Sequence, residues 1–587
     1  MERSAPRARA LPLPCWLAWL AVSAGLLTGC GGGGDASAST AVVVSGAVTF
    51  DKVPVVGLGL DYDRVEQSPA RGLTVEAVRD GDVLDSTTTD EAGRYALELP
   101  PNIAGVKVRV SAEMRRAGTP AWDYRVVDNT EGDALYVLES AEFATEEADL
   151  ALDLHAASGW DGAAYTGTRS AAPFAILDVV YDATQFVLSV APDTVFPPLV
   201  LHWSADNVPS RGADGVPDFA TGEIGSSLFR PGAGIYLLGA EDSDTDEYDR
   251  HVIAHEWAHF FENALARSDS IGGPHTRGDQ LDMRTAFSEG FANAVSAMIT
   301  GDKIYTDVLG PGQASGFAFD VEGPFVPQSS ASHPNPNPGW FSEESVQEIV
   351  YDLFDAAQGA DEPEDTVALG FGPIFDVMTA DIRETPALTS IFAFIDALKR
   401  RVPAVAEDLN ALVEAHAIAP VADAYGSGED NFGTPTDPTA VESDDILPIY
   451  KDLAVGLPVT LCSTDAYNYG GVTGSVNKLG SRAFLKLAVP DVADYAITAT
   501  TVKMPAGATA DPDMILYRSG PFARSEDAPD DAACTVDTPS GCVERFEASL
   551  GPGDYVLEVY EWTNTQPDDG DHPPIGRTCF EVEITAQ

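Results

Sequence analysis

The hydrophobic pattern of this chain changes period twice, and this change limits the folds that the chain can adopt. Near the N-terminus, runs such as Val106-Lys-Val-Arg-Val110 alternate apolar and charged residues, the pattern of a half-buried strand. Between Tyr248 and Leu265, apolar residues recur every three or four positions, as on one face of a helix. After about residue 449 short alternating runs return. Because 587 residues are too many for one core, we predict an α+β domain flanked by two all-β sandwich domains.

Composition places the domain boundaries. We expect an all-β domain over 42–152, a mixed domain over 153–424 and a second all-β domain over 449–587. Residues 425–448 are rich in glycine, proline and acidic residues, which is typical of a linker. Within the mixed domain, the pattern predicts helices over 171–190, 248–265, 285–299, 343–357, 386–401 and 405–416, and strands over 199–203 and 234–239.

The charge balance argues against nucleic acid as a partner. The chain carries 92 acidic and 34 basic residues, a formal net charge of −58. Such a field repels the phosphates of nucleic acids and of anionic lipids. A well-solvated exterior explains the same excess, so the charge describes solubility rather than fold.

The first 30 residues have the pattern of an export signal. Arg3, Arg7 and Arg9 precede an apolar run from Leu11 to Leu27. The following Leu27-Thr-Gly-Cys30 resembles the lipobox of bacterial lipoproteins, which implies that residues 1–30 form a lipoprotein signal and that Cys30 carries the lipid. The alternative is a plain signal peptide with an incidental cysteine.

The residues after Cys30 are small and polar. We expect residues 31–41 to form a flexible tether. Because Gly31 is not the aspartate linked to inner-membrane retention, lipoprotein sorting implies the outer membrane. The membrane contact would come through Cys30 alone, since the best later apolar segment, from Phe174 to Ala191, is interrupted by Asp178 and Asp182.

The cysteines also indicate an exported chain. Four lie in the last 126 residues, and an even set in an exported domain indicates two disulfides with three possible pairings. We expect Cys534 to pair with Cys542 across a short loop and Cys462 to pair with Cys579 across the ends of the domain.

The stretch from His251 to Phe260 holds three of the nine histidines of the chain. On a helix, His255 and His259 lie one turn apart on the same face and can bind a single metal ion, while Glu256 can take a proton from water beside it. This is the H-E-x-x-H pattern of zinc metallopeptidases. The alternative is a chance group of surface or core histidines.

Zinc needs a third protein ligand. A metzincin would have glycine at position 262 and histidine at position 265, but Glu262 and Leu265 stand there. Glu289, on the next predicted helix in Ser288-Glu-Gly-Phe-Ala-Asn293, instead resembles the third ligand of the gluzincins, the thermolysin-like class. The alternative is a solvated acid at the start of that helix.

Segments 267–275 and 282–290 also resemble a group of uncharacterised bacterial zinc-peptidase-like proteins. In one departure, Asn293 takes the place of an aspartate that often orients a zinc histidine, so it adds no charge there. A further hydrogen-bond donor should stabilise the oxyanion. His275, His333 and Tyr351 are candidates for that role. The strand over 234–239 is a candidate for pairing with the substrate backbone.

Both flanking domains resemble accessory domains of exported peptidases. Val44–Phe50 and Thr89–Leu97, which contains a D-x-x-G-x-Y turn, resemble the carboxypeptidase regulatory-like β-sandwich. Asp511–Tyr517 and Leu550–Tyr560 resemble the pre-peptidase C-terminal domain. The first resemblance implies an accessory β-sandwich without catalytic residues, and the second implies a β-sandwich of the kind that many secreted peptidases carry.

A second acidic stretch, Asp242-Ser-Asp-Thr-Asp246 followed by Asp249, alternates oxygen ligands as Ca²⁺-binding loops do. It lacks the glycine and the final glutamate of an EF-hand loop, so a Ca²⁺ site stays unsupported. The sequence favours a solvated acidic segment before a helix.

Together these resemblances imply an exported, lipid-anchored zinc metallopeptidase that acts on proteins or peptides. One catalytic Zn²⁺ would be bound by His255, His259 and Glu289, with Glu256 as general base. The alternative is a surface lipoprotein that binds a partner and keeps an inactive peptidase scaffold. An intact Glu256 favours the enzyme, because a scaffold has no need of it.

Overall fold

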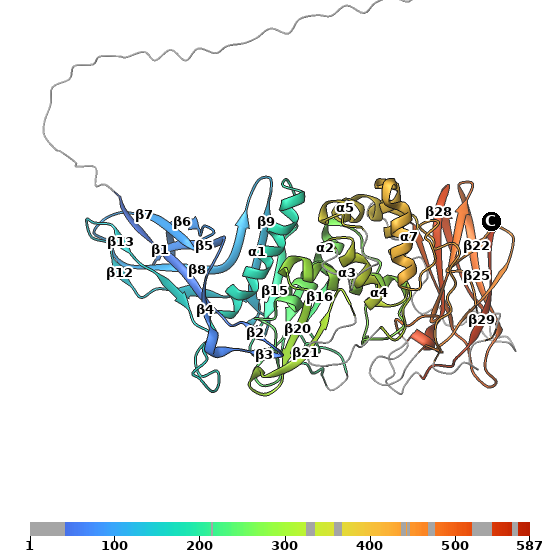
Figure 1. Cartoon of the computed structure of the whole chain (residues 1–587), viewed down its shortest axis with the longest axis horizontal. Helices are drawn as coiled ribbons and strands as arrows, with labels where there is room; N and C mark the ends of the chain where they lie inside the picture. Colours follow the sequence, from blue (N-terminus) through green and yellow to red (C-terminus); the bar gives the residue numbers. More distant parts are fainter. Residues whose placement is uncertain are drawn as a thin grey trace, which may run out of the picture.

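The computed structural model describes residues 41–212, 215–323, 335–356, 367–435, 442, 446–467, 476–518, 543–565 and 573–587. In Figure 1 strands lie at the N-terminal end, helices in the middle and a second group of strands at the C-terminal end. The protein therefore has the mixed, multidomain, β-rich architecture expected from the change in hydrophobic period.

The N-terminal region contains two sheets. In the first, β1 is the centre and pairs with all four of its neighbours. Its strands are β1 (Val42–Lys52), β4 (Glu66–Pro69), β7 (Arg94–Leu99), β13 (Leu150–Ala151) and β14 (Leu154–Ala156). A separate hairpin joins β2 (Val55–Val56) to β3 (Gly59–Leu60).

The second sheet has ten strands and continues across the boundary expected at residue 152. Its main path runs β16-β17-β15-β9-β8-β5-β6, and β15 pairs in parallel with both β9 and β17. The strands are β5 (Leu73–Arg79), β6 (Asp82–Thr88), β8 (Ala104–Arg116), β9 (Trp122–Asp128), β10 (Ala134–Leu135), β11 (Val137–Glu139), β12 (Phe143–Ala144), β15 (Leu199–Trp203), β16 (Leu228–Arg230) and β17 (Gly234–Leu237). The N-terminal strands and the central region thus share one sheet.

The D-x-x-G-x-Y turn, from Asp90 to Tyr95, leads into β7 and is stabilised by its own hydrogen bonds. The Asp90 carboxylate accepts hydrogen bonds from the backbone N–H groups of Ala92 and Arg94 at 2.9 and 2.8 Å. Gly93 has a φ of +72°, and a Cβ there would lie 2.4 Å from the carbonyl oxygen of Val48. This close approach explains the need for glycine in the turn.

The central region contains the helices and a small four-stranded sheet. The helices are α1 (Ala172–Val190), α2 (Arg250–Leu265), α3 (Met283–Thr300), α4 (Glu343–Asp352), α5 (Phe371–Asp376), α6 (Ile391–Arg401) and α7 (Ala406–Ala415), with a π-helical turn over Val377–Ile382 after α5. The sheet has the order β18 (Gly239–Ala240), β19 (Asp244–Thr245), β20 (Ile304–Leu309), β21 (Ser315–Asp320). The six helices predicted from periodicity are present: α3 is slightly longer than predicted and the others are shorter, whereas α5 and the β20–β21 hairpin were not predicted.

Helix α1 is long and apolar enough to cross a membrane by length and composition alone, although the sequence analysis judged this segment to be interrupted by Asp178 and Asp182. It is nevertheless mostly buried within the protein, and its Asp178 accepts a hydrogen bond from Arg71 at 2.8 Å. These contacts are those of a helix in the core of the protein.

The C-terminal region is a sandwich of two four-stranded sheets with an apolar core between them. One sheet has the order β22 (Tyr450–Leu453), β24 (Arg482–Val489), β28 (Gly553–Glu561), β26 (Pro512–Arg518). The other has the order β23 (Val459–Ser463), β29 (Thr578–Ala586), β25 (Ala493–Lys503), β27 (Val543–Leu550). Cys462 and Cys579 face each other on β23 and β29 and form the predicted disulfide. Cys534 and Cys542 lie outside the described residues.

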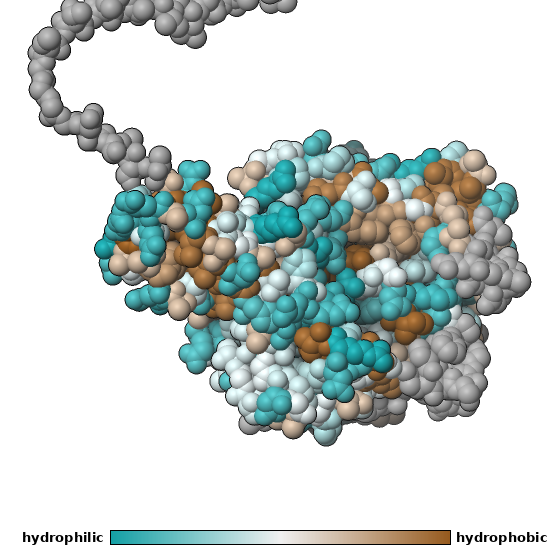
Figure 2. Space-filling model, turned by 60° about the vertical axis from the view of Figure 1, so that its left-hand side comes forward, coloured by the Kyte–Doolittle hydropathy of each residue, from teal (hydrophilic) through white to brown (hydrophobic). Residues whose placement is uncertain are grey.

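The segment predicted as a linker packs closely where it is described. The Gln280 amide donates to the carbonyl oxygen of Thr434 at 2.7 Å, and the Tyr467 hydroxyl accepts from the N–H of Gly433 at 3.0 Å. On the face shown in Figure 2, hydrophilic residues are interspersed with smaller hydrophobic areas. This distribution agrees with the solvated exterior that the net charge suggested.

Candidate metal centre

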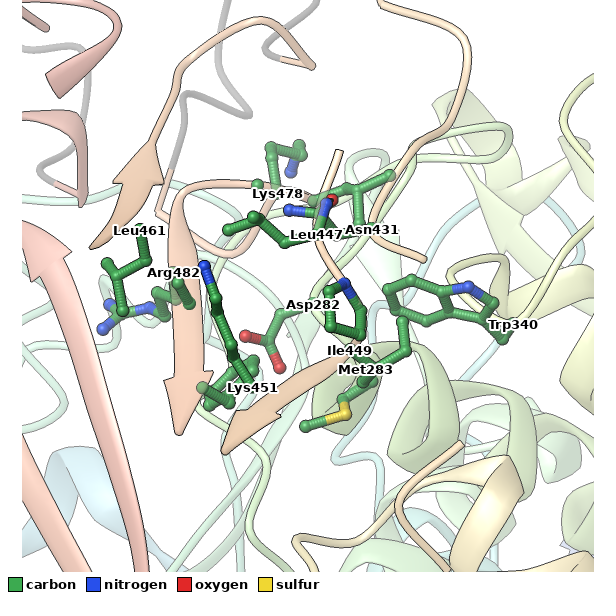
Figure 3. A pocket seen from close by; sticks show the side chains of 15 residues that line it. Asp282, Met283, Trp340, Asn431, Leu447, Ile449, Lys451, Leu461, Lys478 and Arg482 are labelled. Carbon is green, nitrogen blue, oxygen red and sulfur yellow. The ribbon is translucent and has the colours of Figure 1, made fainter. Parts of the chain in front are cut away.

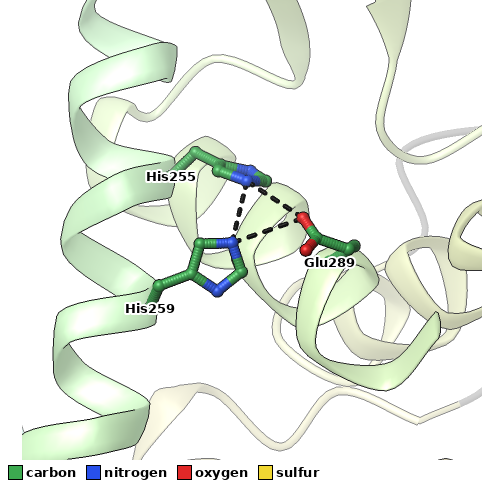
Figure 4. Close-up of side chains that lie close together, drawn as sticks. All are labelled: His255, His259 and Glu289. Atoms are coloured by element: carbon green, nitrogen blue, oxygen red, sulfur yellow. Dashed lines mark hydrogen bonds and ion pairs between the residues drawn. The ribbon is translucent and has the colours of Figure 1, made fainter. Parts of the chain in front are cut away.

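Helix α2 presents two imidazoles to one point. Val252, Ile253 and Trp257 bury its apolar face, and His255 and His259 share a different face one turn apart. Their rings meet edge to face, and the two Nε2 atoms lie 3.1 Å apart. Figure 4 shows both rings directed toward Glu289.

Glu289 comes from α3, which packs beside α2. One of its carboxylate oxygens lies 3.4 Å from Nε2 of His255 and 3.3 Å from Nε2 of His259. Ligands about 2.1 Å from one tetrahedral ion are separated by about 3.4 Å, so the three donor atoms have the spacing of a single zinc site. The next residue, Gly290, lets α4 approach, because a Cβ there would lie 2.6 Å from the carbonyl oxygen of Glu343.

The outer ring nitrogens of both histidines have partners. Nδ1 of His255 lies 2.9 Å from Oδ1 of Asn293, and the amide of Asn293 donates to Gln347 at 3.0 Å. Nδ1 of His259 lies 3.1 Å from the Ser288 hydroxyl and 3.4 Å from Glu262. An Nδ1–H that donates to an acceptor leaves the Nε2 lone pair free for a metal. Asn293 thus lies where the sequence placed an orienting residue.

Glu256 lies on α2 with its side chain buried. Its carboxylate accepts a hydrogen bond from the backbone N–H of Phe229 on β16. Among the described strands β16 ends the ten-stranded sheet, and this N–H points away from β17, toward the histidine helix. The strand predicted to face a substrate, Gly234–Leu237 of β17, instead lies between β15 and β16 and has no free edge.

His275 lies beside Glu289, although 13 residues separate the two in the sequence and His275 stands outside α3. Its Nε2 is 3.6 Å from the Glu289 carboxylate and 3.3 Å from that of Glu343, and its Nδ1 lies 3.1 Å from the carbonyl oxygen of Gly273. Burial lowers the pKa of His275, but the charges of Glu289 and Glu343 raise it above its usual value. The structure therefore brings this candidate to the metal residues.

The other sequence candidates lie elsewhere. Tyr351 is in the α4 core against Phe354, and Asp355 and Glu322 are the carboxylates that act most strongly on its hydroxyl. His333 lies outside the described residues. His251, the first histidine of the cluster, lies with Nε2 2.9 Å from the carbonyl oxygen of Asp302 and makes no contact with Glu289 among the interactions of the described residues.

The electrostatics of the centre favour an ionised Glu289. Burial alone raises the pKa of Glu289, but His259 and His275 more than offset it and hold the pKa well below its usual value. The carboxylate therefore stays charged, as a metal ligand must be.

Four contacting residues were not predicted from the sequence: Glu262, Ser288, Glu343 and Gln347. Glu262 could have been found, because it follows His259 by three residues on the same helix. The positions of Ser288, Glu343 and Gln347 depend on how α3 and α4 pack, which periodicity does not specify.

The acidic stretch before α2 is not solvated as predicted. Asp246 is 2% exposed and Asp249 is fully buried. The fold covers them with β20, a strand that the sequence did not predict.

A pocket lies at the junction of the central region and the C-terminal sandwich, away from the histidines. It is lined by Asp282 and Met283 at the start of α3, by Trp340, and by residues of the sandwich such as Lys451 and Arg482 (Figure 3). Neither His255, His259 nor Glu289 lines it, so it is distinct from the metal centre.

No protein-family model matches the chain, and no curated protein matches it. Part of the chain is similar in structure to the pre-peptidase C-terminal domain of collagenase from Bacillus anthracis, with 13% identity over 23% of this chain and 93% of that domain and a TM-score of 0.14. A second similarity is to CorA, a surface-associated copper-binding protein of Methylomicrobium album BG8, with 11% identity over 24% of this chain and 99% of that protein and a TM-score of 0.15. These values carry no conclusion about function.

Proposed function

We propose that this protein is a zinc-dependent metallopeptidase of the gluzincin type, with the zincin fold in its central domain. The observation that carries the proposal is the convergence of His255, His259 and Glu289 at zinc-ligand spacing, with their outer nitrogens held by hydrogen bonds and Glu256 alongside.

His255, His259 and Glu289 would hold a Zn²⁺ ion, which would supply a Lewis acid and lower the pKa of the attacking water toward about 7. Glu256 accepts the proton of the attacking water and returns it to the leaving amine. The N–H of Phe229 holds the Glu256 carboxylate in place for this transfer. His275, whose Nε2 lies 3.6 Å from the Glu289 carboxylate, is the nearby side chain that could donate a hydrogen bond to the reacting carbonyl.

The outer edge of β16, which pairs with no other described strand, supports the proposal of a peptide substrate. Because the outward N–H of Phe229 bonds to Glu256, an extended peptide that adds to this edge would pass beside the general base. Main-chain pairing of this kind positions a peptide bond without requiring a particular side chain.

We also propose that the chain is exported and anchored at the outer membrane through a lipid on Cys30. The Cys462–Cys579 disulfide supports an oxidising compartment. Cys30→Ser should release the protein from the membrane fraction. Unchanged detergent-dependent fractionation of this variant would contradict the anchor.

Glu256→Gln tests the enzymatic proposal, because it is nearly isosteric and keeps all three metal ligands. We expect the variant to retain zinc, measured by mass spectrometry, and to lose about 10²–10⁴-fold or more in turnover of a quenched peptide, since the general base is gone. Glu414→Gln, the same change at an exposed position on α7, is the matched control and should keep full activity.

Full activity in Glu256→Gln would overturn the peptidase mechanism. A wild-type protein that binds zinc but cleaves no peptide, protein or casein substrate would instead favour the inactive-scaffold alternative.

A further inference from the structure

A second group of convergent acidic side chains lies at the start of α2. Asp244 is on β19, Asp246 follows β19, and Asp307 is on β20. One carboxylate oxygen from each lies within 4.8 Å of the others. Pairing of Asp244 with Leu309 brings the two strands together although they are about sixty residues apart. Asp249, the residue before α2, lies beside this group.

Asp246 and Asp249 are buried, Asp244 and Asp307 are partly buried, and each carboxylate keeps an oxygen without a hydrogen bond among the described residues. Asp246 uses one oxygen to accept from the Ser227 hydroxyl, and Asp249 uses one to accept from the Val308 N–H at 2.7 Å. The Oδ1 atoms of Asp244, Asp246, Asp249 and Asp307 are buried and have no hydrogen-bond donor among the described residues. Asp246 is 2% exposed, so a side chain that is almost fully buried directs an unpartnered oxygen into the group.

The charges around this group have the same sign. Burial, and then the carboxylates of Asp307, Asp244 and Asp249, raise the pKa of Asp246 well above its usual value. A buried carboxylate without a partner carries a large desolvation cost, and its acidic neighbours add repulsion. A bound cation removes both costs at once.

The ligand chemistry identifies the kind of cation. The group offers carboxylate oxygens and neither imidazole nor thiolate, and hard cations prefer such a set. Ca²⁺ binds oxygens at about 2.3–2.6 Å, so two oxygens on one ion lie at most about 5 Å apart. The observed limit of 4.8 Å satisfies this geometry.

We propose that Asp244, Asp246 and Asp307, with Asp249 beside them, form a binding site for one Ca²⁺ ion. The ion joins β19, β20 and the first turn of α2. Tyr305, also on β20, lies edge to face against His255 with ring centroids 6.2 Å apart, so the same strand contacts the zinc residues. Ca²⁺ thus holds β20 against the helix that carries Glu256.

Equilibrium dialysis with radioactive Ca²⁺, on the zinc-loaded full chain at constant zinc, tests the proposal together with thermal unfolding in the presence and absence of Ca²⁺. We expect saturable binding of one Ca²⁺ per chain and a Tm that rises with Ca²⁺. Asp307→Asn, which keeps the side-chain shape, should weaken binding at least about tenfold, because the site loses a charged ligand. Asp193→Asn, at an exposed position, is the control and should bind as the wild type does.

Relative to the wild type, the Tm of Asp307→Asn should differ in opposite directions without and with Ca²⁺. Without Ca²⁺ the variant should melt above the wild type, because one repelling charge is gone. With Ca²⁺ it should melt below the wild type, because it gains less from the ion. If Asp307→Asn fails to fold, Asp244→Asn, which changes another partly buried member of the group, provides the same comparison.

The proposal is overturned if the wild type shows no saturable binding up to about 10 mM Ca²⁺ and no change in Tm, which would mean that protons neutralise the group. Undiminished binding in Asp307→Asn would also overturn it. Neither result depends on peptidase activity, so the Ca²⁺ site and the proposed function can fail separately.

Discussion

Helix α3 carries two buried charged clusters five residues apart, and they are built in opposite ways. At its start, the buried Arg284 guanidinium is paired with Asp282 at 2.8 Å and with Glu558 of the C-terminal sandwich at 2.8 Å. One turn and a half later, Glu289 faces His255 and His259 at distances too long for direct hydrogen bonds of normal length.

The first cluster is complete without a further ligand. Glu558 accepts hydrogen bonds from Arg284, from Arg482 at 2.7 Å and from the Tyr517 hydroxyl at 2.6 Å. Asp282 also caps α3 by accepting from the N–H of Arg284. Every charge has an opposite charge beside it, so the cluster joins two regions and needs no ion.

In the second, open cluster the outer polar atoms have hydrogen-bond partners, whereas the inner atoms face one another around a common point. Its outer nitrogens have partners, whereas three lone-pair donors converge at the middle. The comparison shows that burial and charge alone do not mark a functional site. The two clusters differ in the arrangement of their polar atoms. In the first, hydrogen-bond donors and acceptors alternate, whereas in the second, acceptors converge on one point.

The largest effect on stability is expected from breaking the complete cluster. Arg284→Met leaves Glu558 and Asp282 buried with fewer counter-charges, which costs about 3–5 kcal/mol for buried pairs of this kind. Chemical unfolding of the full chain measures the loss. Arg79→Met is the matched control, because Arg79 is 44% exposed and pairs with an exposed aspartate, so the change should cost no more than about 1 kcal/mol.

Equal stability losses in Arg284→Met and Arg79→Met would contradict the role of the first cluster as a junction. Zinc bound by folded Arg284→Met should be unchanged, because Arg284 contributes no donor to the second cluster.

The next effect concerns the open cluster. Asn293→Ala removes the partner of His255 Nδ1, and loss of such an outer contact lowers metal affinity about 10–100-fold. Competition with a chromogenic chelator measures the zinc affinity. Asn293→Asp should keep or increase the affinity, because a carboxylate still accepts from Nδ1. Unchanged affinity in Asn293→Ala would mean that the contact does not orient the ring.

The smallest effect is a pH dependence. Burial raises the pKa of Glu558, but Arg284 and Arg482 lower it far more, so it lies well below the usual value. A carboxyl with a lowered folded-state pKa contributes stability that is present above its unfolded pKa of about 4.3 and is lost as the pH falls through the folded-state pKa. The difference in unfolding free energy between wild type and Glu558→Gln should therefore stay constant from pH 8 to about 5 and shrink below about pH 4. A difference that already shrinks between pH 7 and pH 6 would contradict this assignment.

The sequence predicted the elements of the open cluster better than those of the complete one. His255, His259 and Asn293 follow from helical spacing and a recognisable motif, and the structure brings them together with Glu289. Nothing near Arg284 indicated Glu558, which lies 274 residues away. Pairings of this range depend on how two folded regions dock, and local periodicity carries no information about docking.

The same limit applies to the strands around the site. The sequence identified residues 234–239 as a strand but could not tell that β16 would cover its outer edge. The sequence also failed to predict β20. This strand pairs with β19 and brings Asp307 next to the acidic residues before α2, which had been predicted to be solvated but are largely buried. Strand order within a sheet is set by long-range contacts, so both features required the structure.

The zinc content of purified wild type and of Glu289→Ala tests the central claim most directly. Since Glu289 supplies the third donor at 3.3–3.4 Å from both imidazoles, we expect about one zinc per wild-type chain and almost none in folded Glu289→Ala, with peptide hydrolysis lost in parallel. Folded wild-type protein that binds no zinc, or Glu289→Ala that binds as much zinc as the wild type, would contradict the account.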